Sequence, residues 1–203
     1  MVNQSKFDVC LIFLLGSSVS GCGTPGPVTY PRLDNLSAGI FLEAQERTVL
    51  PEGVELRRVY DKGIGSTKSS EGFRSRLYND AADYCTIGYG HLIKKAPCDG
   101  SEPDEFRGSV TEPYATEVLT ADMRKSQIAV MEMVNIDLTD GQYAALCDFA
   151  FNVGTSNLRK SALLKVVNGK QLDSVPSQFR RWVMAGGKEI QGLKTRRAKE
   201  IEL

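Results

Sequence analysis

The sequence predicts an α+β domain that is mostly helical and carries a small β-hairpin lobe flanking a cleft. Helix signals precede Glu71, and Asn79-Asp80 has the composition of a turn. The run from Thr86 to His91 holds two glycines two positions apart, which allow the positive φ of a hairpin turn. Helical patterns dominate the rest of the chain. A helix end that faces a hairpin across a groove places side chains on both sides of a bound polymer.

The composition, 41% hydrophobic and 25% charged residues in a chain of 203, is that of an ordinary globular protein. The 25 basic residues balance 25 acidic ones, which gives no general attraction to nucleic acid or to anionic lipid. His91 is the single histidine, which argues against a zinc site and leaves few options for a Ser-His-Asp or Cys-His mechanism. We expect a monomer without metal or cofactor.

Residues 1–21 are typical of a signal peptide. Their apolar core, Val9 to Leu15, is shorter than the ~20 residues that a membrane-spanning helix requires, and small residues follow it. The run Val19-Ser20-Gly21-Cys22 has the pattern of a lipobox, which predicts export, acylation of Cys22 and a membrane anchor facing the periplasm or the exterior. A plain export signal cut near the same place and a phage-type signal anchor are the alternatives.

Residues 22–54 predict a flexible tether, because Pro, Gly, Ser and Thr are frequent at their start. The tether leads into one domain spanning residues 55–203. A leader of this kind suits a protein that is fixed at one end and must reach a mesh.

Three residues in the run from Glu71 to Leu92 have the chemistry of glycoside hydrolysis. Glu71 and Asp80 lie nine positions apart, and Thr86 follows six positions later. Cleavage of a glycosidic bond needs one carboxyl group that donates a proton and one carboxylate that stabilises positive charge or activates water. A glutamate at a helix end, partly covered by the core, suits the acid, and an aspartate in an open loop suits the base.

The whole run, E-G-F-R-x-x-x-Y-x-D-x(5)-T-I-G-Y-G-H, resembles the catalytic stretch of the bacteriophage-type lysozymes, glycoside hydrolase family 24. The resemblance implies a lysozyme-like fold and cleavage, with inversion, of the bond between N-acetylmuramic acid and N-acetylglucosamine in the glycan strands of peptidoglycan. It implies Glu71 as general acid, Asp80 as the opposing carboxylate, and Thr86 as the residue that helps place the attacking water.

The helix that delivers Glu71 is expected over residues 62–70, with Asp61 as its N-cap. The resembled family usually has large apolar residues along this helix, whereas this chain has Ser66, Thr67 and Ser70. We therefore expect weaker packing around Glu71 and a lower activity than the motif alone implies.

Downstream segments supply candidate supporting residues. Thr111 is expected to cap a helix that has Pro113 in its first turn and apolar residues at helical spacing up to Val134. Asp122 lies on the apolar face of this helix and therefore needs a partner. His91 is the expected partner, as a histidine pairs with an aspartate in the resembled family, which predicts a structural role for His91.

The run Leu138 to Gly154 predicts a helix that opens with a capping box of Thr139 and Gln142 and ends at Gly154. Its match to the resembled family implies that Asn152 lies along the floor of the sugar cleft, where a neutral amide suits acetamido groups. Asn152 and Gly90 are thus the candidate substrate-binding residues.

The chain after Gly154 predicts three short helices separated at Asn168-Gly169 and Gly186-Gly187. In the resembled family an arginine of the last helix reaches the catalytic glutamate. Arg196 and Arg197 are the candidates for this role, and Arg197 is the preferred one.

Three cysteines, Cys85, Cys98 and Cys147, lie in the predicted domain, which allows one disulfide. A bridge between Cys85 and Cys98 would close a loop over the hairpin and contribute about 3 kcal/mol. Cys147 lies on an apolar helix face and is expected to be a buried free thiol.

The sequence thus predicts a peptidoglycan hydrolase of the lysozyme type, exported to the cell envelope and held there by a lipid at Cys22. Two other functions stay open. A lytic transglycosylase needs the glutamate alone and forms an anhydro product, and a catalytically silent peptidoglycan-binding lipoprotein would tolerate the polar residues before Glu71.

Overall fold

The computed structural model describes residues 49–203. The predicted signal peptide, Cys22 and residues 22–48 of the predicted tether lie outside this part of the chain. The described helices are α1 (Asp61–Glu71), α2 (Asp104–Arg107), α3 (Glu112–Asp122), α4 (Arg124–Met133), α5 (Asp140–Val153), α6 (Thr155–Lys160), α7 (Ala162–Asn168), the 3-10 helix η1 (Leu172–Ser174), α8 (Val175–Phe179) and α9 (Gln191–Glu202). The strands are β1 (Arg74–Asn79), β2 (Cys85–Gly88), β3 (His91–Lys94), β4 (Met184–Ala185) and β5 (Lys188–Glu189). The predicted α+β class is confirmed.

Strands β1, β2 and β3 form an antiparallel sheet in that order. The predicted hairpin is its β2–β3 pair, where Gly88 and Gly90 adopt φ values of +66° and +84° around the turn. Glycine is needed here because other residues rarely adopt a positive φ. Strand β1 adds a third strand ahead of the predicted hairpin, and it ends at Asn79, where the turn was expected.

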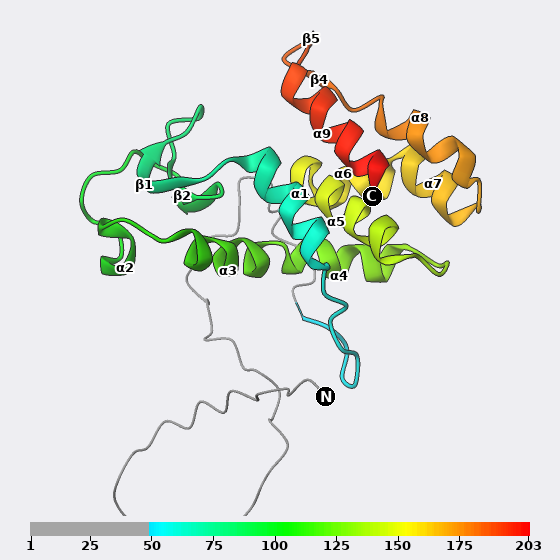
Figure 1. Cartoon of the computed structure of the whole chain (residues 1–203), viewed down its shortest axis with the longest axis horizontal. Coiled ribbons are helices and arrows are strands. Elements are labelled where there is room, and N and C mark those ends of the chain that lie inside the picture. Colours follow the sequence, from blue (N-terminus) through cyan, green and yellow to red (C-terminus); the bar gives the residue numbers. More distant parts are fainter. Residues whose placement is uncertain (1–48) are drawn as a thin grey trace, which may run out of the picture. The chain divides into compact units, whose positions relative to one another are not determined.

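Helix α1 lies against α5 and α9. Its C-terminal end, which carries Glu71, points toward the sheet and leads into β1 (Figure 1). Gly63 makes the contact with α5 close: a Cβ atom built on it would lie 2.6 Å from the Cβ atom of Ala144. Of the three polar residues that led us to expect weak packing along α1, Thr67 is fully buried, and its hydroxyl donates to the Gly63 carbonyl oxygen. Ser66 and Ser70 are only partly buried, so the expectation of weaker packing stays a prediction.

The N-cap of α1 differs from the prediction. Tyr60 occupies the cap position with extended backbone angles, and no side chain bonds to the helix start there. Asp61 is instead the first helical residue, where its carboxylate faces the positive end of the helix dipole.

The other predicted helix starts are confirmed. Thr111 accepts a hydrogen bond from the Tyr114 amide at the start of α3, whose first turn contains proline. Thr139 and Gln142 form both bonds of the capping box that opens α5. Gly154 ends α5, as expected.

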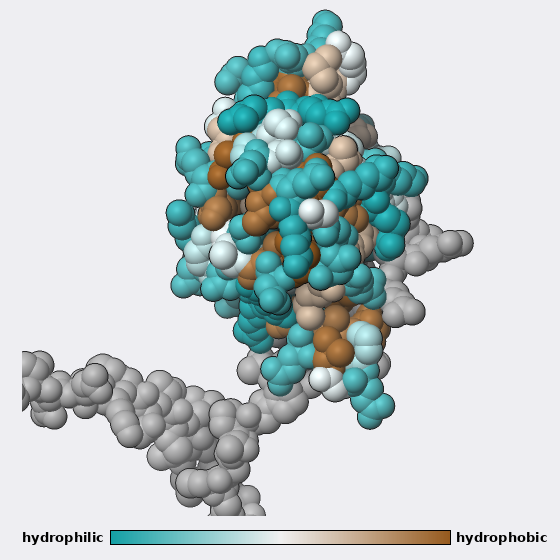
Figure 2. All heavy atoms as spheres, turned by 90° about the vertical axis from the view of Figure 1, so that its right-hand side faces the viewer, coloured by the Kyte–Doolittle hydropathy of each residue, from teal (hydrophilic) through white to brown (hydrophobic). Residues whose placement is uncertain are grey.

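The hydrophobic core is centred on α5, whose residues 143–150 are all buried. Edge-on contacts of the Phe149 ring with Phe179 and Trp182 join α5 to the C-terminal segments. The face drawn in Figure 2 is mainly hydrophilic, with hydrophobic residues scattered among the polar ones. Within residues 49–203, no helix has the length and apolarity needed to cross a bilayer.

Three segments differ from the predicted element pattern. The first of the short helices expected after Gly154 is divided at Ser161 into α6 and α7. The segment expected as one helix from Thr111 to Val134 is divided at Met123 into α3 and α4. Residues 184–189 form the short β4–β5 hairpin, which turns at Gly186 and Gly187 with φ values of +56° and +76°. The sequence predicts only a break between helices at these two glycines, so the hairpin corrects that prediction.

Candidate active site

Glu71 is the last residue of α1, and the following Gly72 leaves the helix with a φ of +74°. The Glu71 side chain is 23% exposed, and its Oε1 atom lies 2.6 Å from Nη1 of Arg196. The preference for Arg197 as the partner of Glu71 is therefore wrong. Consecutive residues of a helix point about 100° apart, so only one of the two arginines of α9 can face α1.

Arg196 holds a second carboxylate behind Glu71. Its Nε and Nη2 atoms donate to the two oxygens of Asp148 at 3.0 and 2.8 Å, in a two-pronged contact that is nearly inaccessible to water. Burial alone would raise the pKa of Asp148, but the Arg196 guanidinium outweighs burial and holds that pKa below its usual value. Arg196 thus joins α1, α5 and α9 behind the end of α1 that carries Glu71.

Arg197 points into the body of the domain, and only 1% of its side chain is exposed. Its Nη2 atom lies 2.6 Å from Oε1 of Glu200 and donates to Oδ1 of Asn152 at 3.0 Å, while its guanidinium lies over the Phe149 ring. Because an arginine side chain only donates, the oxygen of the Asn152 amide has to face Arg197. The amide nitrogen of the half-buried Asn152 then points away from Arg197.

Asp80 lies in the turn after β1, held by local backbone groups. Its Oδ1 atom accepts hydrogen bonds from the amides of Ala82 and Tyr84 at 2.8 and 2.9 Å. Burial raises the pKa of the neighbouring Tyr78, Arg74 lowers it, and the Asp80 and Glu71 carboxylates raise it further. Both carboxylates therefore lie within electrostatic reach of the Tyr78 phenol.

Thr86 lies on β2 opposite Tyr78 of β1, and it is buried. Its hydroxyl donates to the Tyr84 carbonyl oxygen at 3.0 Å. Gly90, in the turn at the other end of the β2–β3 pair, faces Glu71: a Cβ atom built on it would lie 3.6 Å from Glu71 Oε2. The hairpin thus meets the helix end that carries Glu71, and β2 pairs with the strand that leads into Asp80.

His91 and Asp122 form the expected pair, with 2.8 Å between Nδ1 and Oδ2. His91 is buried and its ring packs against Phe106. The pair joins β3 to the last residue of α3 and so holds the hairpin on the helical body.

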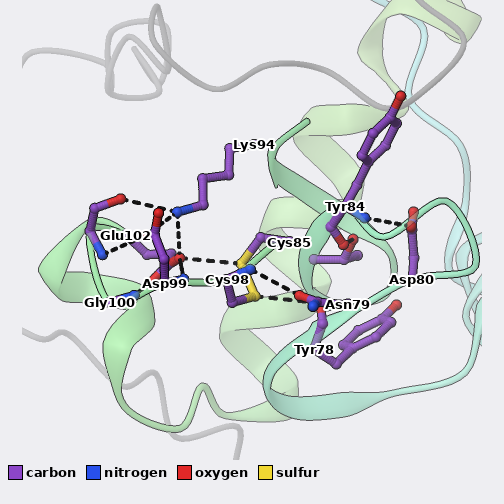
Figure 3. The surroundings of a disulfide bond; sticks show 12 residues. Tyr78, Asn79, Asp80, Tyr84, Cys85, Lys94, Cys98, Asp99, Gly100 and Glu102 are labelled. Carbon is purple, nitrogen blue, oxygen red and sulfur yellow. Dashed lines mark hydrogen bonds and ion pairs between the residues drawn. A yellow bond between two sulfur atoms is a disulfide. The ribbon is translucent and has the colours of Figure 1, made fainter. Parts of the chain in front are cut away.

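Cys85 and Cys98 are joined by a disulfide, the pairing that the sequence predicts, and Cys147 is a buried free thiol. Figure 3 shows the disulfide beside the turn that carries Asp80: the Cys98 amide donates to Oδ1 of Asn79 at 2.9 Å. Glu102 lies on the other side and bonds Lys94 and the amides of residues 99 and 100. The disulfide therefore ties β2, the strand that carries Thr86, to the loop after β3.

Among residues 49–203, the cluster with enough potential ligands for a metal ion consists of Cys85, Cys98 and Glu102. The two sulfur atoms are bonded to each other, so neither offers a thiolate. This cluster therefore does not fit a metal ion.

Asp148 and Glu200, together with Arg196 and Arg197, form a buried cluster behind Glu71, and neither acidic residue was among the predicted site residues. Burial and the nearby Asp148 carboxylate raise the pKa of Glu200 to about 10, against the opposite effect of the Arg197 guanidinium. An acidic residue inside the apolar run around Phe149 was the signal for Asp148, because buried carboxylates need a partner.

A family model described as phage lysozyme matches residues 68–200. The endolysin of Bacillus phage B103 is 33% identical over 144 residues, which cover 70% of this chain and 51% of that protein. The endolysin of Salmonella phage P22 is 31% identical over 148 residues, which cover 73% of this chain and 98% of that protein. The chain thus spans about half the length of its Bacillus phage relatives.

Two solved structures have the same fold. A variant of P22 lysozyme superposes with a TM-score of 0.63 at 29% identity, covering 71% of this chain and 97% of that one. The muramidase domain of SpmX from Asticaccaulis excentricus gives a TM-score of 0.61 at 27% identity, covering 71% and 95%. The arrangement of helices around a small sheet is therefore lysozyme-like, as the sequence predicts.

Proposed function

Because this chain belongs to the phage lysozyme family, we propose that it is a muramidase that hydrolyses the bond between N-acetylmuramic acid and N-acetylglucosamine in peptidoglycan. Glu71 donates a proton to the departing glycosidic oxygen. Asp80 and Thr86 position the water that attacks the sugar carbon from the opposite face, which inverts its configuration.

The observation that carries this proposal is the surroundings of Glu71. One carboxyl oxygen is fixed by Arg196, and the other faces Gly90 of the hairpin. A fixed carboxyl group at the edge of a hairpin suits a proton donor, because acid catalysis depends on the position of the proton relative to the leaving oxygen. Asp80, which has one oxygen held by two amides, suits the placement of a water molecule through its second oxygen.

Digestion of purified peptidoglycan tests the proposal. We expect hydrolysed muramic acid ends, seen by mass spectrometry, and inversion, seen by NMR of freshly released fragments. We expect Glu71→Gln to lower the rate by at least about 100-fold, since a general acid contributes roughly 10²–10⁴-fold. Asp80→Asn and Thr86→Ala are expected to show severe but incomplete losses. Glu117→Gln, at an exposed position of α3, is the matched control.

Three results would contradict the assignment. Full activity of Glu71→Gln would exclude Glu71 as the acid. Anhydro ends in the products would indicate a lytic transglycosylase. Binding to peptidoglycan without any cleavage by the wild-type protein would indicate a silent binding protein. Circular dichroism of each variant separates loss of chemistry from loss of fold.

We also propose that the protein acts in the cell envelope, anchored by an acylated Cys22. The lipobox pattern of residues 19–22 and the Pro- and Gly-rich run after it support this proposal. Labelling of the expressed protein with a radioactive fatty acid should mark the wild type and leave Cys22→Ser unlabelled. Equal labelling of both, or of neither, would contradict the lipid anchor.

A further inference from the structure

Three polar side chains outside the proposed catalytic set connect α1, the β2–β3 turn and α3. The Tyr89 hydroxyl donates to Oε1 of Glu112 at 2.7 Å. Nζ of Lys68 lies 3.0 Å from the same Glu112 oxygen and 5.4 Å from the centre of the Tyr89 ring. One carboxylate thus joins three elements that lie apart in the sequence, and we call Lys68, Tyr89 and Glu112 the bridge residues.

The bridge residues flank the contact between Glu71 and the hairpin. Lys68 precedes Glu71 by three positions, and its carbonyl oxygen accepts the Gly72 amide that closes α1. Tyr89 directly precedes Gly90, the residue that faces Glu71 Oε2. The Tyr89 ring also lies 5.5 Å from the ring of Phe73, just beyond the end of α1. The bridge therefore acts where the last turn of α1 meets the turn of the hairpin.

The pKa shifts of Lys68 and Glu112 agree with three side chains that act as one connected unit. Hydrogen bonding to Glu112 raises the pKa of Lys68, and bonds from Tyr89 and Lys68 lower the pKa of Glu112. The Tyr89 side chain is buried, whereas those of Lys68 and Glu112 are 26% and 56% exposed. Salt therefore screens the ion pair more than the buried tyrosine contact.

The last turn of a helix tends to fray, because its final carbonyl groups lack partners within the helix. Reaction rates, in turn, depend on sub-ångström placement of the reacting groups. We propose that Lys68, Tyr89 and Glu112 are positioning residues that hold the end of α1 against the hairpin and thereby fix Glu71 relative to the strand of Thr86. The inference rests on the proposed roles of Glu71 and Thr86.

Tyr89→Phe is the primary test, because it removes one hydroxyl and keeps the ring that packs on Phe73. Its matched control is Tyr114→Phe, since the Tyr114 hydroxyl bonds Glu105 at 3.5 Å and its ring packs on Phe106. We expect kcat on soluble peptidoglycan fragments to fall about 3- to 10-fold for Tyr89→Phe, the loss that one hydrogen bond supports, with KM unchanged. The control should retain wild-type kcat.

Lys68 gives a test by conservative replacement. We expect Lys68→Met to lower kcat by a similar factor and Lys68→Arg to restore most of it, because the ion pair needs a cation at this position. Residues that act as one unit have non-additive effects, so Lys68→Met combined with Tyr89→Phe should lose little more than either change alone. Rising salt should lower the kcat of the wild type and leave that of Lys68→Met flat.

The outcomes separate this inference from the proposed function. A wild-type kcat for Tyr89→Phe, together with an inactive Glu71→Gln, would contradict the positioning role of the bridge residues and leave the muramidase assignment intact. Equal losses of kcat in Tyr89→Phe and Tyr114→Phe would also overturn it, as would independent, multiplicative effects in the double variant. A kcat loss without a larger fall in Tm than the control shows would support it.

Discussion

Glu71 and Asp80, the two carboxyl groups of the candidate active site, are held by different means. Glu71 depends on Arg196, which lies 125 positions later in the sequence, and on a buried cluster contributed by α5 and α9. Asp80 depends on two amides within four positions of it and on a nearby disulfide. The position of Glu71 is therefore sensitive to distant buried charges, whereas the position of Asp80 is defined by a short stretch of chain.

Removal of Arg196 should cause the largest loss in the free energy of unfolding. Arg196→Met leaves the Asp148 carboxylate, of which 1% is exposed, without its cation, and we expect the free energy of unfolding to fall by about 3–5 kcal/mol. Chemical denaturation measures this loss. Lys194→Met, on the same helix as Arg196, breaks an exposed ion pair with Glu189 of β5; it is the control and should cost less than about 1 kcal/mol. Similar losses in both variants would contradict the role of the buried cluster.

Loss of the disulfide tests the other side. Cys98→Ser opens a bridge between positions 13 apart, so we expect the free energy of unfolding to fall by about 3 kcal/mol. Because the disulfide lies beside Asn79 and β2, activity should fall together with stability. Dithiothreitol should lower the melting temperature of the wild type and leave that of Cys98→Ser unchanged. An equal response of the two proteins would exclude this disulfide as a source of stability.

The raised pKa of Glu200 should give the free energy of unfolding an unusual dependence on pH. The folded protein raises its pKa from 4.5 to about 10, so the stability that it contributes is complete below about pH 4.5 and is lost as the pH rises toward 10. Glu200→Gln mimics the protonated form and should remove this decline, which amounts to at most about 1.4 kcal/mol per pH unit. Denaturation between pH 5 and pH 9 measures it, with the exposed Glu202→Gln as control. Parallel profiles for Glu200→Gln and the wild type would contradict the prediction.

The smallest change in stability is expected for Asp80→Asn. An asparagine side-chain oxygen accepts the same two amide hydrogen bonds in the turn, so the free energy of unfolding should stay within about 0.5 kcal/mol of the wild-type value. Activity should nevertheless fall sharply. A destabilisation above 2 kcal/mol, measured by the same denaturation assay, would mean that the charge of Asp80 holds the turn.

The features that the sequence predicts well depend on neighbouring residues. The capping box at Thr139 and the hairpin glycines Gly88 and Gly90 each involve residues a few positions apart, so their patterns are visible in the chain itself. The choice between Arg196 and Arg197 depends on the rotation of α9 about its axis. That rotation is set by packing against α1, α5 and α8, which no local pattern records.

The buried cluster shows the same limit. Asp148 and Glu200 come from helices that meet only in the folded domain. An acidic residue in an apolar run indicates that Asp148 needs a partner, but no local pattern identifies that partner as Arg196. The β4–β5 hairpin is a different case. Gly186 and Gly187 fit both a hairpin turn and a break between helices. The strands on either side have two residues each, which is too short to show an alternating pattern in the sequence.

The contact at Gly63 has a mechanical consequence. No space remains between the two helices for even a methyl group, so the helix that carries Glu71 and the central helix of the core are held at a fixed separation. Any side chain larger than hydrogen at residue 63 would have to push α1 away from α5, and the end of α1 that carries Glu71 would shift with it.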